Sequence, residues 1–458
     1  MKNPKTHRAG SRVVLSCLLF VVALLSAACS SDNSNTQSDF QLTASQENLT
    51  LVEGNTAGLS IPLELTRQND HTTPVQLSVE GVTTADEAFL TSVFTQPTLI
   101  PNNDNSQLIL SLAIADLPIL AQQRQIRLVA TDGTETHEIT LSIGIVPVNA
   151  PDVYLLIGQS NMVGFSRNGT REAFAGGLDE TNPRIRQLNV SGNDQIDIFL
   201  EQEDFTSADA NVGPLRIVTA EDPLHVQLDP GNVDGKTQTY IGLGLSFAKA
   251  ALNNTSREII LVPAAWSNSA FCSNEVGPPG QWNAQPTTDP ALGNTWLFDR
   301  AVTRANLALL ETGGILRGIL WHQGEGDSND ACAQSYASNL ELLVQQLRAS
   351  INPDPRGTDL RSSDSNIPFI AGTMSRGIDE RDDLSQFSAA KQIIDDAHKN
   401  LQNVVAFSSL SKHDDLIPAN GYPCGNTSCI HFGAEALREM GLRYYQALER
   451  AVLRSPVN

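Results

Sequence analysis

Hydrophobic and polar positions alternate over the first part of the chain, in short runs that turn-forming residues separate. The runs lie at 51–52, 59–63, 75–79, 108–112 and 139–143. Clusters rich in Asn, Asp, Gly and Pro stand between them, as between the strands of an antiparallel sheet. This pattern predicts a small all-β sandwich of immunoglobulin-like type over residues 40–148. No catalytic constellation appears in it, so we expect a spacer or an accessory binding module.

From residue 151 onward, mostly apolar runs alternate with amphipathic stretches, and the run at 153–157 is unbroken. Runs at 154–157, 258–263, 315–321, 367–371 and 404–407 are typical of strands buried on both faces. Two helical stripes lie between and after them: Tyr336, Leu340, Leu343 and Leu347, then Leu437, Met440, Tyr444 and Leu448. The alternation predicts an α/β domain over residues 151–454, with a three-layer, doubly wound, flavodoxin-like parallel sheet of five strands. The segment 166–239 lacks a clear period, which indicates functional loops.

The first 29 residues have the pattern of an export signal. Basic residues precede an apolar stretch at 13–25, and small residues precede Cys29. A cysteine in this place resembles a bacterial lipoprotein signal, in which Cys29 becomes the lipid-bearing first residue; an ordinary secretory signal is the alternative. The apolar stretch is too short and wrongly flanked for a transmembrane helix. We therefore expect an exported cell-envelope lipoprotein, periplasmic or on the outer surface, anchored to the membrane by its lipid alone, with residues 30–39 as a flexible tether.

Charge narrows the range of partners. The 458 residues include 51 acidic and 30 basic side chains, for a formal net charge of −21. Such acidity argues against nucleic acid as a partner, and against a membrane surface held by charge. The sequence contains no paired CxxC motif and no HExxH motif, so we expect neither a metal nor an organic cofactor.

Four cysteines remain outside the signal: Cys272, Cys332, Cys424 and Cys429. In an oxidising compartment an even number indicates two disulfides, for which three pairings are possible. We favour Cys272–Cys332 and Cys424–Cys429, because the loops that carry the first pair should both lie near Ser160.

Three of the predicted strands end in polar clusters, at 158–160, 267–269 and 322–325. The carboxyl ends of parallel strands meet at one edge of a sheet, and His431, just ahead of the last predicted helix, can reach the same edge. Ser160 by itself carries little weight, because a serine at a strand-to-helix turn is more often an N-cap. With His431 as general base and Glu325 as the acid that orients the imidazole, Ser160 becomes a candidate nucleophile.

Further candidates surround this trio. The backbone N–H groups of Ser160 and Asn268 and the side-chain amide of Gln323 are candidate oxyanion donors. Candidate substrate-binding residues are Gln159, Asn161, Ser267, Trp266 and Trp282, although the tryptophans are as readily core residues. His322, at the end of a buried strand, is expected to be a packed, hydrogen-bonded histidine rather than the base. Asp414 and Asp415 are expected to lie in a solvated turn.

Four segments carry a family resemblance: LLIGQSNMVG at 155–164, GLGLSFA at 242–248, GILWHQGEGD at 318–327 and IHF at 430–432. In this order they resemble the sialic-acid-specific acetylesterase family of carbohydrate esterases, in the SGNH hydrolase superfamily. The resemblance covers roughly residues 152–450. It implies that Ser160 is the nucleophile, His431 the base and Gln323 an oxyanion donor.

The chain departs from the family pattern in two places. Some members use the glutamate that falls at Glu325 as the triad acid, whereas others use an aspartate three residues before the histidine. Here that position is Ser428, which assigns the acid role to Glu325. The usual Gly-Gly after the second strand is replaced by Ser267-Asn268, whose side chains crowd that wall of the site.

The resulting expectation is a serine esterase that hydrolyses O-acetyl esters on carbohydrates through a Ser-His-Glu triad and an acyl-enzyme. Two alternatives stay open. One is a surface glycan-binding protein with a weakened site, which the Ser267-Asn268 departure favours. The other is an esterase that acts on non-carbohydrate esters. Acetylated xylan and O-acetyl sialic acid are both compatible with the sequence.

Overall fold

The computed structural model describes residues 38–82, 90–113, 122–146, 148–164, 177–190, 215–225, 241–267, 269–272, 281–285, 295–353, 367–376, 388–416 and 431–452. Several predicted features lie outside the described residues: the signal with Cys29, the segment with Cys424, Ser428 and Cys429, and Asn268. Within the described ranges, no helix combines the length and the apolar character needed to span a membrane.

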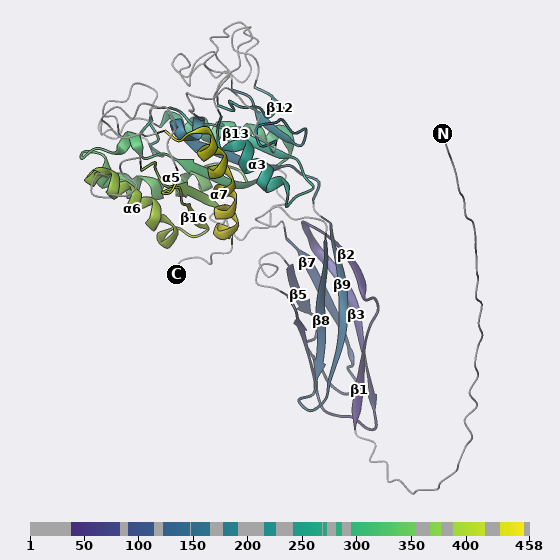
Figure 1. Cartoon of the computed structure of the whole chain (residues 1–458). Coiled ribbons are helices and arrows are strands. Elements are labelled where there is room, and N and C mark those ends of the chain that lie inside the picture. The colour runs from purple at the N-terminus through teal and green to yellow at the C-terminus, as the bar shows by residue number, and fades with distance from the viewer. Residues whose placement is uncertain are drawn as a thin grey trace, which may run out of the picture.

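Two sheets form the amino-terminal sandwich (Figure 1). One has the order β1-β3-β7-β5, with β1 (Asp39–Ala44), β3 (Asn55–Gln68), β7 (Asn105–Leu112) and β5 (Leu90–Phe94). The other has the order β2-β9-β8-β4-β6, with β2 (Asn48–Val52), β9 (Thr136–Val146), β8 (Gln122–Thr131), β4 (Val75–Glu80) and β6 (Thr98–Leu99). The strands pair antiparallel except β2, which pairs parallel with β9. The five runs predicted for this region all fall inside strands.

A seven-stranded sheet begins at residue 152 and has the order β12-β11-β13-β10-β14-β15-β16. Its strands are β10 (Asp152–Gly158), β11 (Ile185–Leu188), β12 (Ile217–Thr219), β13 (Ile259–Pro263), β14 (Ile315–His322), β15 (Phe369–Gly372) and β16 (Ser408–Ser411). Neighbours pair parallel except the edge strand β12, which is antiparallel to β11. Every residue of β10, β13 and β14 is buried, as expected for strands covered on both faces.

The sheet therefore differs from the prediction in strand number, in its antiparallel edge strand β12 and, most clearly among the boundaries, in the place of the last strand. It has seven strands instead of five, because β11 and β12 lie inside the segment 166–239 that the sequence assigns to loops. The last strand begins at Ser408 instead of residue 404, because Val404 is still the final residue of helix α6 (Ala389–Val404).

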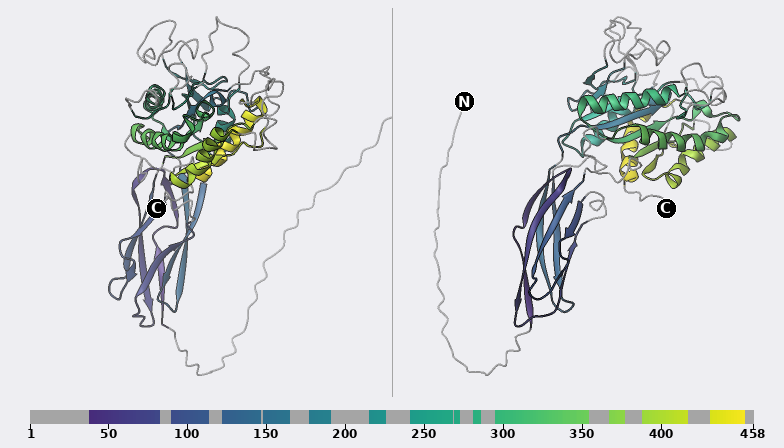
Figure 2. Two further views of the ribbon diagram at one scale, coloured as in Figure 1. Left: turned by 90° about the vertical axis from the view of Figure 1, so that its left-hand side faces the viewer. Right: turned by 180° about the vertical axis from the view of Figure 1, so that it is seen from behind.

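Helices cover both faces of this sheet, which gives the three predicted layers (Figure 2). On one face, α4 (Trp296–Thr312), α5 (Tyr336–Ser350) and α6 pack on Val153, Leu155 and Ile157 of β10. On the other, α3 (Gly244–Leu252) and α7 (Ala434–Val452) pack on Tyr154 and Leu156. The alternation along β10 thus divides its side chains between two cores. Both predicted helical stripes are buried in full.

A buried charge network joins the sandwich to the amino end of this sheet. Glu53, in the turn after β2, lies 2.5 Å from Arg257 Nη1 and 3.4 Å from Arg317 Nη2. Both arginines also bind Asp152, the first residue of β10. None of these side chains is more than 2% exposed, so each charge depends on the others. The sandwich is fixed to the amino edge of the sheet, and the carboxyl edge faces away from it (Figure 1).

Candidate active site

Ser160 stands where the central strand β10 ends and the short helix α2 (Ser160–Val163) begins. The turn depends on Gly158, whose φ of +130° suits glycine. A Cβ at Gly158 would lie 2.1 Å from the carbonyl oxygen of His322, so only glycine lets β14 approach this closely. Gln159 N then donates to the same carbonyl at 2.8 Å. The end of β14 thus holds the serine turn at the carboxyl edge of the sheet.

The structure brings His431 to Ser160, although 271 positions separate them. His431 Nε2 lies 2.9 Å from Ser160 Oγ, a hydrogen-bond distance that suits proton transfer from the hydroxyl to the imidazole. Ser160 is 7% exposed, and His431 directly precedes the residues that lead into α7. This distance meets the geometric requirement for an imidazole that activates a serine hydroxyl.

The Glu325 carboxylate does not bind His431, which corrects the expected direct contact. Its Oε1 accepts a hydrogen bond from Asn161 Nδ2 at 2.8 Å, and no hydrogen bond or ion pair joins it to His431 among the described residues. Asn161 Oδ1 in turn accepts from Phe432 N at 3.1 Å. Burial raises the pKa of Glu325, against the opposing effects of hydrogen bonds from its own backbone N–H and from Asn161. Among the described residues, Asn161 therefore links Glu325 to the histidine segment.

Gln323 is also placed differently from the prediction. Its Nε2 donates to Ser269 O at 3.0 Å and to Asp327 Oδ2 at 2.8 Å, and its Oε1 accepts from Tyr336 OH at 2.9 Å. The side chain is fully buried, and both amide hydrogens are engaged. This geometry does not support an oxyanion role for Gln323, because a buried carboxylate already binds the amide.

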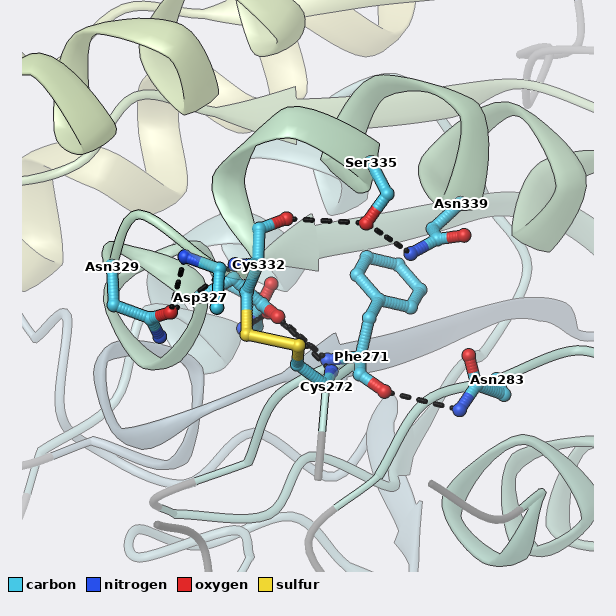
Figure 3. The surroundings of a disulfide bond; sticks show 10 residues. Phe271, Cys272, Asn283, Asp327, Asn329, Cys332, Ser335 and Asn339 are labelled. Atoms are coloured by element: carbon cyan, nitrogen blue, oxygen red, sulfur yellow. Dashed lines mark hydrogen bonds between the residues drawn. A yellow bond between two sulfur atoms is a disulfide. The ribbon is translucent and has the colours of Figure 1, made fainter. Parts of the chain in front are cut away.

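Asp327 is a buried residue that the sequence reasoning missed. Besides Gln323, it accepts hydrogen bonds from Phe271 N and Cys272 N at 3.0–3.1 Å (Figure 3). Burial raises its pKa to about 6, against these hydrogen bonds. The sequence signals were its place two residues after Glu325 and at the end of the family segment 318–327. Asp327 holds the segment after β13 against the turn after β14.

The predicted disulfide Cys272–Cys332 is confirmed and lies beside Asp327 (Figure 3). It closes 60 positions of sequence and joins the same two segments. The Sγ atoms of both cysteines lie close to the Asp327 carboxylate, but their covalent bond leaves no thiolate for a metal. This cluster is therefore structural.

The candidate substrate-binding residues are mostly buried supports. Gln159 Oε1 accepts from Gly326 N at 3.2 Å, and Asn161 is 1% exposed. Trp282 is fully buried, donates from Nε1 to Ser269 Oγ at 2.8 Å and packs edge-on against Trp321. These contacts assign Trp282 to the core rather than to a sugar cleft.

The two other candidates of this set flank the end of β13. Trp266 is 7% exposed, and the Arg300 guanidinium lies 5.4 Å from the centre of its ring. Ser267 is half-buried. Neither position contradicts contact with a substrate at the rim, although little of Trp266 is accessible.

His322 is a packed, hydrogen-bonded histidine, as predicted. It is fully buried, and its Nδ1 lies 2.9 Å from Tyr444 OH. That hydroxyl donates to Trp321 O at 2.7 Å, so its oxygen accepts from Nδ1–H of His322. Burial lowers the pKa of His322 well below its usual value, which keeps the ring neutral. The rival acid Asp415 is exposed and bound to Arg443, which lowers its pKa to about 2.

Residues 150–450 match the family model described as carbohydrate esterase, sialic acid-specific acetylesterase. A probable carbohydrate esterase of Arabidopsis thaliana is 31% identical over 215 residues. That match covers 45% of this chain and 66% of the relative, slightly less than two thirds of its length.

Two solved structures are similar at low identity. The crystal structure of NanS is 17% identical, covers 67% of this chain and 98% of its own, and has a TM-score of 0.45. A carbohydrate acetylesterase from Xanthomonas citri is 15% identical, covers 88% of this chain and 72% of its own, and has a TM-score of 0.43.

Proposed function

The chain belongs to the sialic acid-specific acetylesterase family of carbohydrate esterases, and we propose that it hydrolyses O-acetyl esters on carbohydrates with Ser160 as the nucleophile. The observation that carries the proposal is the 2.9 Å hydrogen bond between Ser160 Oγ and His431 Nε2. A serine hydroxyl is a weak nucleophile unless a neutral imidazole takes its proton, and the hydrogen bond to Ser160 supports this role for His431.

In this mechanism Ser160 Oγ attacks the acetyl carbonyl while its proton passes to His431 Nε2. His431 then donates the proton to the leaving sugar oxygen, which gives an acetyl-enzyme and a free hydroxyl. A water molecule that His431 deprotonates then attacks the acetyl-enzyme; the bond between Ser160 Oγ and the acetyl carbon breaks, His431 returns the proton to Oγ, and acetate is released. The backbone N–H groups of Ser160 and Asn268 stabilise the oxyanion in this proposal. Glu325 is the acid of the site, and Asn161 lies between it and the histidine segment.

The test compares Ser160→Ala and His431→Ala with the wild type on an aryl acetate. We expect kcat/KM to fall by about 10⁴-fold or more in both variants, because each removes a member of the reacting pair. Asp415→Asn is the control, since Asp415 binds Arg443 on the surface. Near-wild-type rates in either alanine variant would refute the proposal. A burst of product in the pre-steady state would exclude a protein that only binds glycans.

We also propose that Cys29 carries a lipid anchor and that the sandwich is a spacer. The Glu53 network supports the spacer, because it fixes the sandwich at the sheet edge opposite Ser160. An anchored chain would then present its active site away from the anchored end. Metabolic labelling with a fatty acid tests the anchor, and we expect Cys29→Ser to abolish incorporation. Acetate release from a series of acetylated glycans, including xylan and sialic acid, would identify the substrate.

A further inference from the structure

Among the described residues, Asn161 contacts both Glu325 and the segment that carries His431. Its Nδ2 donates to Glu325 Oε1 at 2.8 Å, and its Oδ1 accepts from Phe432 N at 3.1 Å. We propose that Asn161 is a positioning residue, through which the Glu325 carboxylate holds the His431 imidazole on Ser160. This inference rests on the proposed function and deepens it, since it concerns how the same reacting pair is aligned.

The two partners of Asn161 determine its orientation. An ionised carboxylate only accepts hydrogen bonds, and a backbone N–H only donates them. Asparagine supplies a donor on one side and an acceptor on the other within one short, planar group. Aspartate in its place would put two carboxylates face to face, and leucine would leave both partners unbound. The site therefore requires an amide at position 161.

Bulk water cannot replace the hydrogen bonds that Asn161 makes to Phe432 N and to Glu325. Phe432 is fully buried, and its ring packs edge-on against His322 at 5.8 Å. A buried backbone N–H without a partner is costly, so Phe432 N depends on Asn161 Oδ1. The Glu325 side chain is 6% exposed, and its second oxygen has no partner among the described residues. Asn161 is therefore the one side chain in the described part of the chain that donates a hydrogen bond to this carboxylate, and His322 Nε2 lies 4.0 Å from the same oxygen, beyond hydrogen-bond distance.

The contacts of Asn161 lie directly beside the two residues proposed to react. Asn161 follows Ser160 in the first turn of α2, and Phe432 follows His431. The reacting pair is thus joined twice, once through Oγ and Nε2 and once through the adjacent residues. A charge-assisted hydrogen bond from Asn161 to Glu325 polarises the amide and strengthens its other end as an acceptor. Loss of this link frees the backbone beside His431 to move.

A direct triad and this indirect link respond differently to Glu325→Gln. When the acid binds the histidine itself, replacement by an amide costs about 10⁴-fold in kcat. In the arrangement seen here, the amide side chain of the variant still offers a carbonyl oxygen to Asn161 Nδ2, so only the charge is lost. We expect Glu325→Gln to lower kcat by about 3–10-fold, as for one weakened hydrogen bond.

A second test exchanges the amide and the carboxylate between positions 161 and 325. Asn161→Asp alone brings two carboxylates together, and we expect kcat to fall by about 100-fold with KM nearly unchanged. In Asn161→Asp combined with Glu325→Gln, the new glutamine amide donates to the new aspartate, whose other oxygen accepts from Phe432 N. We expect the double variant to recover kcat to within about 10-fold of the wild type, a coupling that independent damage to the fold would not produce.

A matched control is available in Asn306 on α4. Its Nδ2 donates to Ser350 O at 3.2 Å and its Oδ1 accepts from Asn352 N at 2.9 Å, so it makes the same kind of two-ended bridge. Neither contact involves the residues around Ser160. We expect Asn306→Asp to leave kcat unchanged, and thermal melts of all variants will show which of them fold.

The experiment measures kcat and KM for the wild type, both single variants, the double variant and Asn306→Asp on an aryl acetate. It also records the ¹⁵N chemical shift of His431 Nε2, which reports on the imidazole without turnover. We expect the shift to move in Asn161→Asp and to return in the double variant. A 10⁴-fold loss in Glu325→Gln, or a double variant no better than Asn161→Asp in either readout, would overturn the inference. A wild type without Ser160-dependent turnover would refute the proposed function instead, and the chemical shifts would still test the link.

Discussion

The carboxylate of Glu53 lies 2.5 Å from Nη1 of Arg257, although 204 positions separate the two residues and they belong to different domains. The same carboxylate accepts from Val148 N at 2.9 Å, in the segment that connects the domains. One side chain of the sandwich therefore holds the connecting segment and the sheet together. Because the network is sealed from water, removal of one charge leaves the others buried without a full set of partners.

Glu53→Gln is expected to lower the free energy of unfolding of the full chain by about 3–5 kcal/mol, because it leaves two buried arginines with Asp152 as their shared acid. Chemical denaturation followed by tryptophan fluorescence measures the change, since all four tryptophans lie outside the sandwich. Glu80→Gln is the control, because Glu80 pairs with Arg127 at the surface, where loss of a pair costs less than about 1 kcal/mol. Equal effects of the two substitutions would mean that the Glu53 network does not support the catalytic domain.

Asp327 should make the protein less stable as the pH rises through the acid range. Burial raises its pKa in the folded chain to about 6, from 3.8 for the free side chain. The folded chain then binds this proton more tightly than the unfolded chain, so stability is lost between about pH 4 and pH 6. The gap between the two values corresponds to about 3 kcal/mol. We expect the unfolding free energy of the wild type minus that of Asp327→Asn to fall by about 1–3 kcal/mol from pH 4 to pH 7.

The control for this pH dependence is Asp415→Asn, because the pKa of Asp415 is shifted in the opposite direction from that of Asp327. Arg443 lowers the pKa of Asp415 to about 2, so its contribution is present above about pH 4 and is lost only as the pH falls. The corresponding difference should stay level or rise slightly over the same range. A fall of similar size for both residues would show that Asp327 is not the source.

The sequence predicted the parts of the fold that have strong apolar patterns and missed those that do not. β10, β13 and β14 are mostly apolar, although β10 begins with Asp152 and β14 contains Arg317, and they were predicted within two residues of their observed bounds. β11 and β12 are only four and three residues long, and Arg186 and Gln187 interrupt the first. β16 reads Ser-Ser-Leu-Ser, yet Ser408 is buried because its hydroxyl donates to Leu401 O and Val405 O. A strand whose polar groups are satisfied by the backbone has no hydrophobic signature.

The site, like the fold, was predicted in part: the sequence indicated which segments meet, but not which side chains bind each other. The ends of β10 and β14 had to meet because parallel strands share one edge, which made Ser160 and the Gln323 segment neighbours by topology alone. The choice of partners within that edge depends on side-chain direction. Gln323 turns to Asp327, and Glu325 turns to Asn161, which lies 164 positions away. Pattern and spacing cannot rank such alternatives, and only the packed structure distinguishes them.

The Cys272–Cys332 disulfide is expected to contribute stability rather than catalytic alignment. A cross-link over 60 positions removes conformational freedom from the unfolded chain, worth about 4 kcal/mol. The double variant Cys272→Ser with Cys332→Ser should lose a large part of this stabilisation, as measured by chemical denaturation. Its kcat should change little, because the three hydrogen bonds to Asp327 still hold both segments. A large loss of kcat in a well-folded double variant would show instead that the cross-link aligns the site.

Trp282→Phe distinguishes a core tryptophan from a sugar-stacking one. The indole is fully buried, donates to Ser269 Oγ and contacts Trp321, so its replacement removes a hydrogen bond and leaves a small cavity. We expect the free energy of unfolding to fall by about 1–3 kcal/mol, with KM for an acetylated carbohydrate unchanged. Comparison of KM for the carbohydrate and for an aryl acetate, which lacks the sugar ring, isolates any stacking contribution. If KM rose for the carbohydrate alone while the thermal stability stayed at the wild-type value, Trp282 would have to reach the substrate, and its burial in the core would be contradicted.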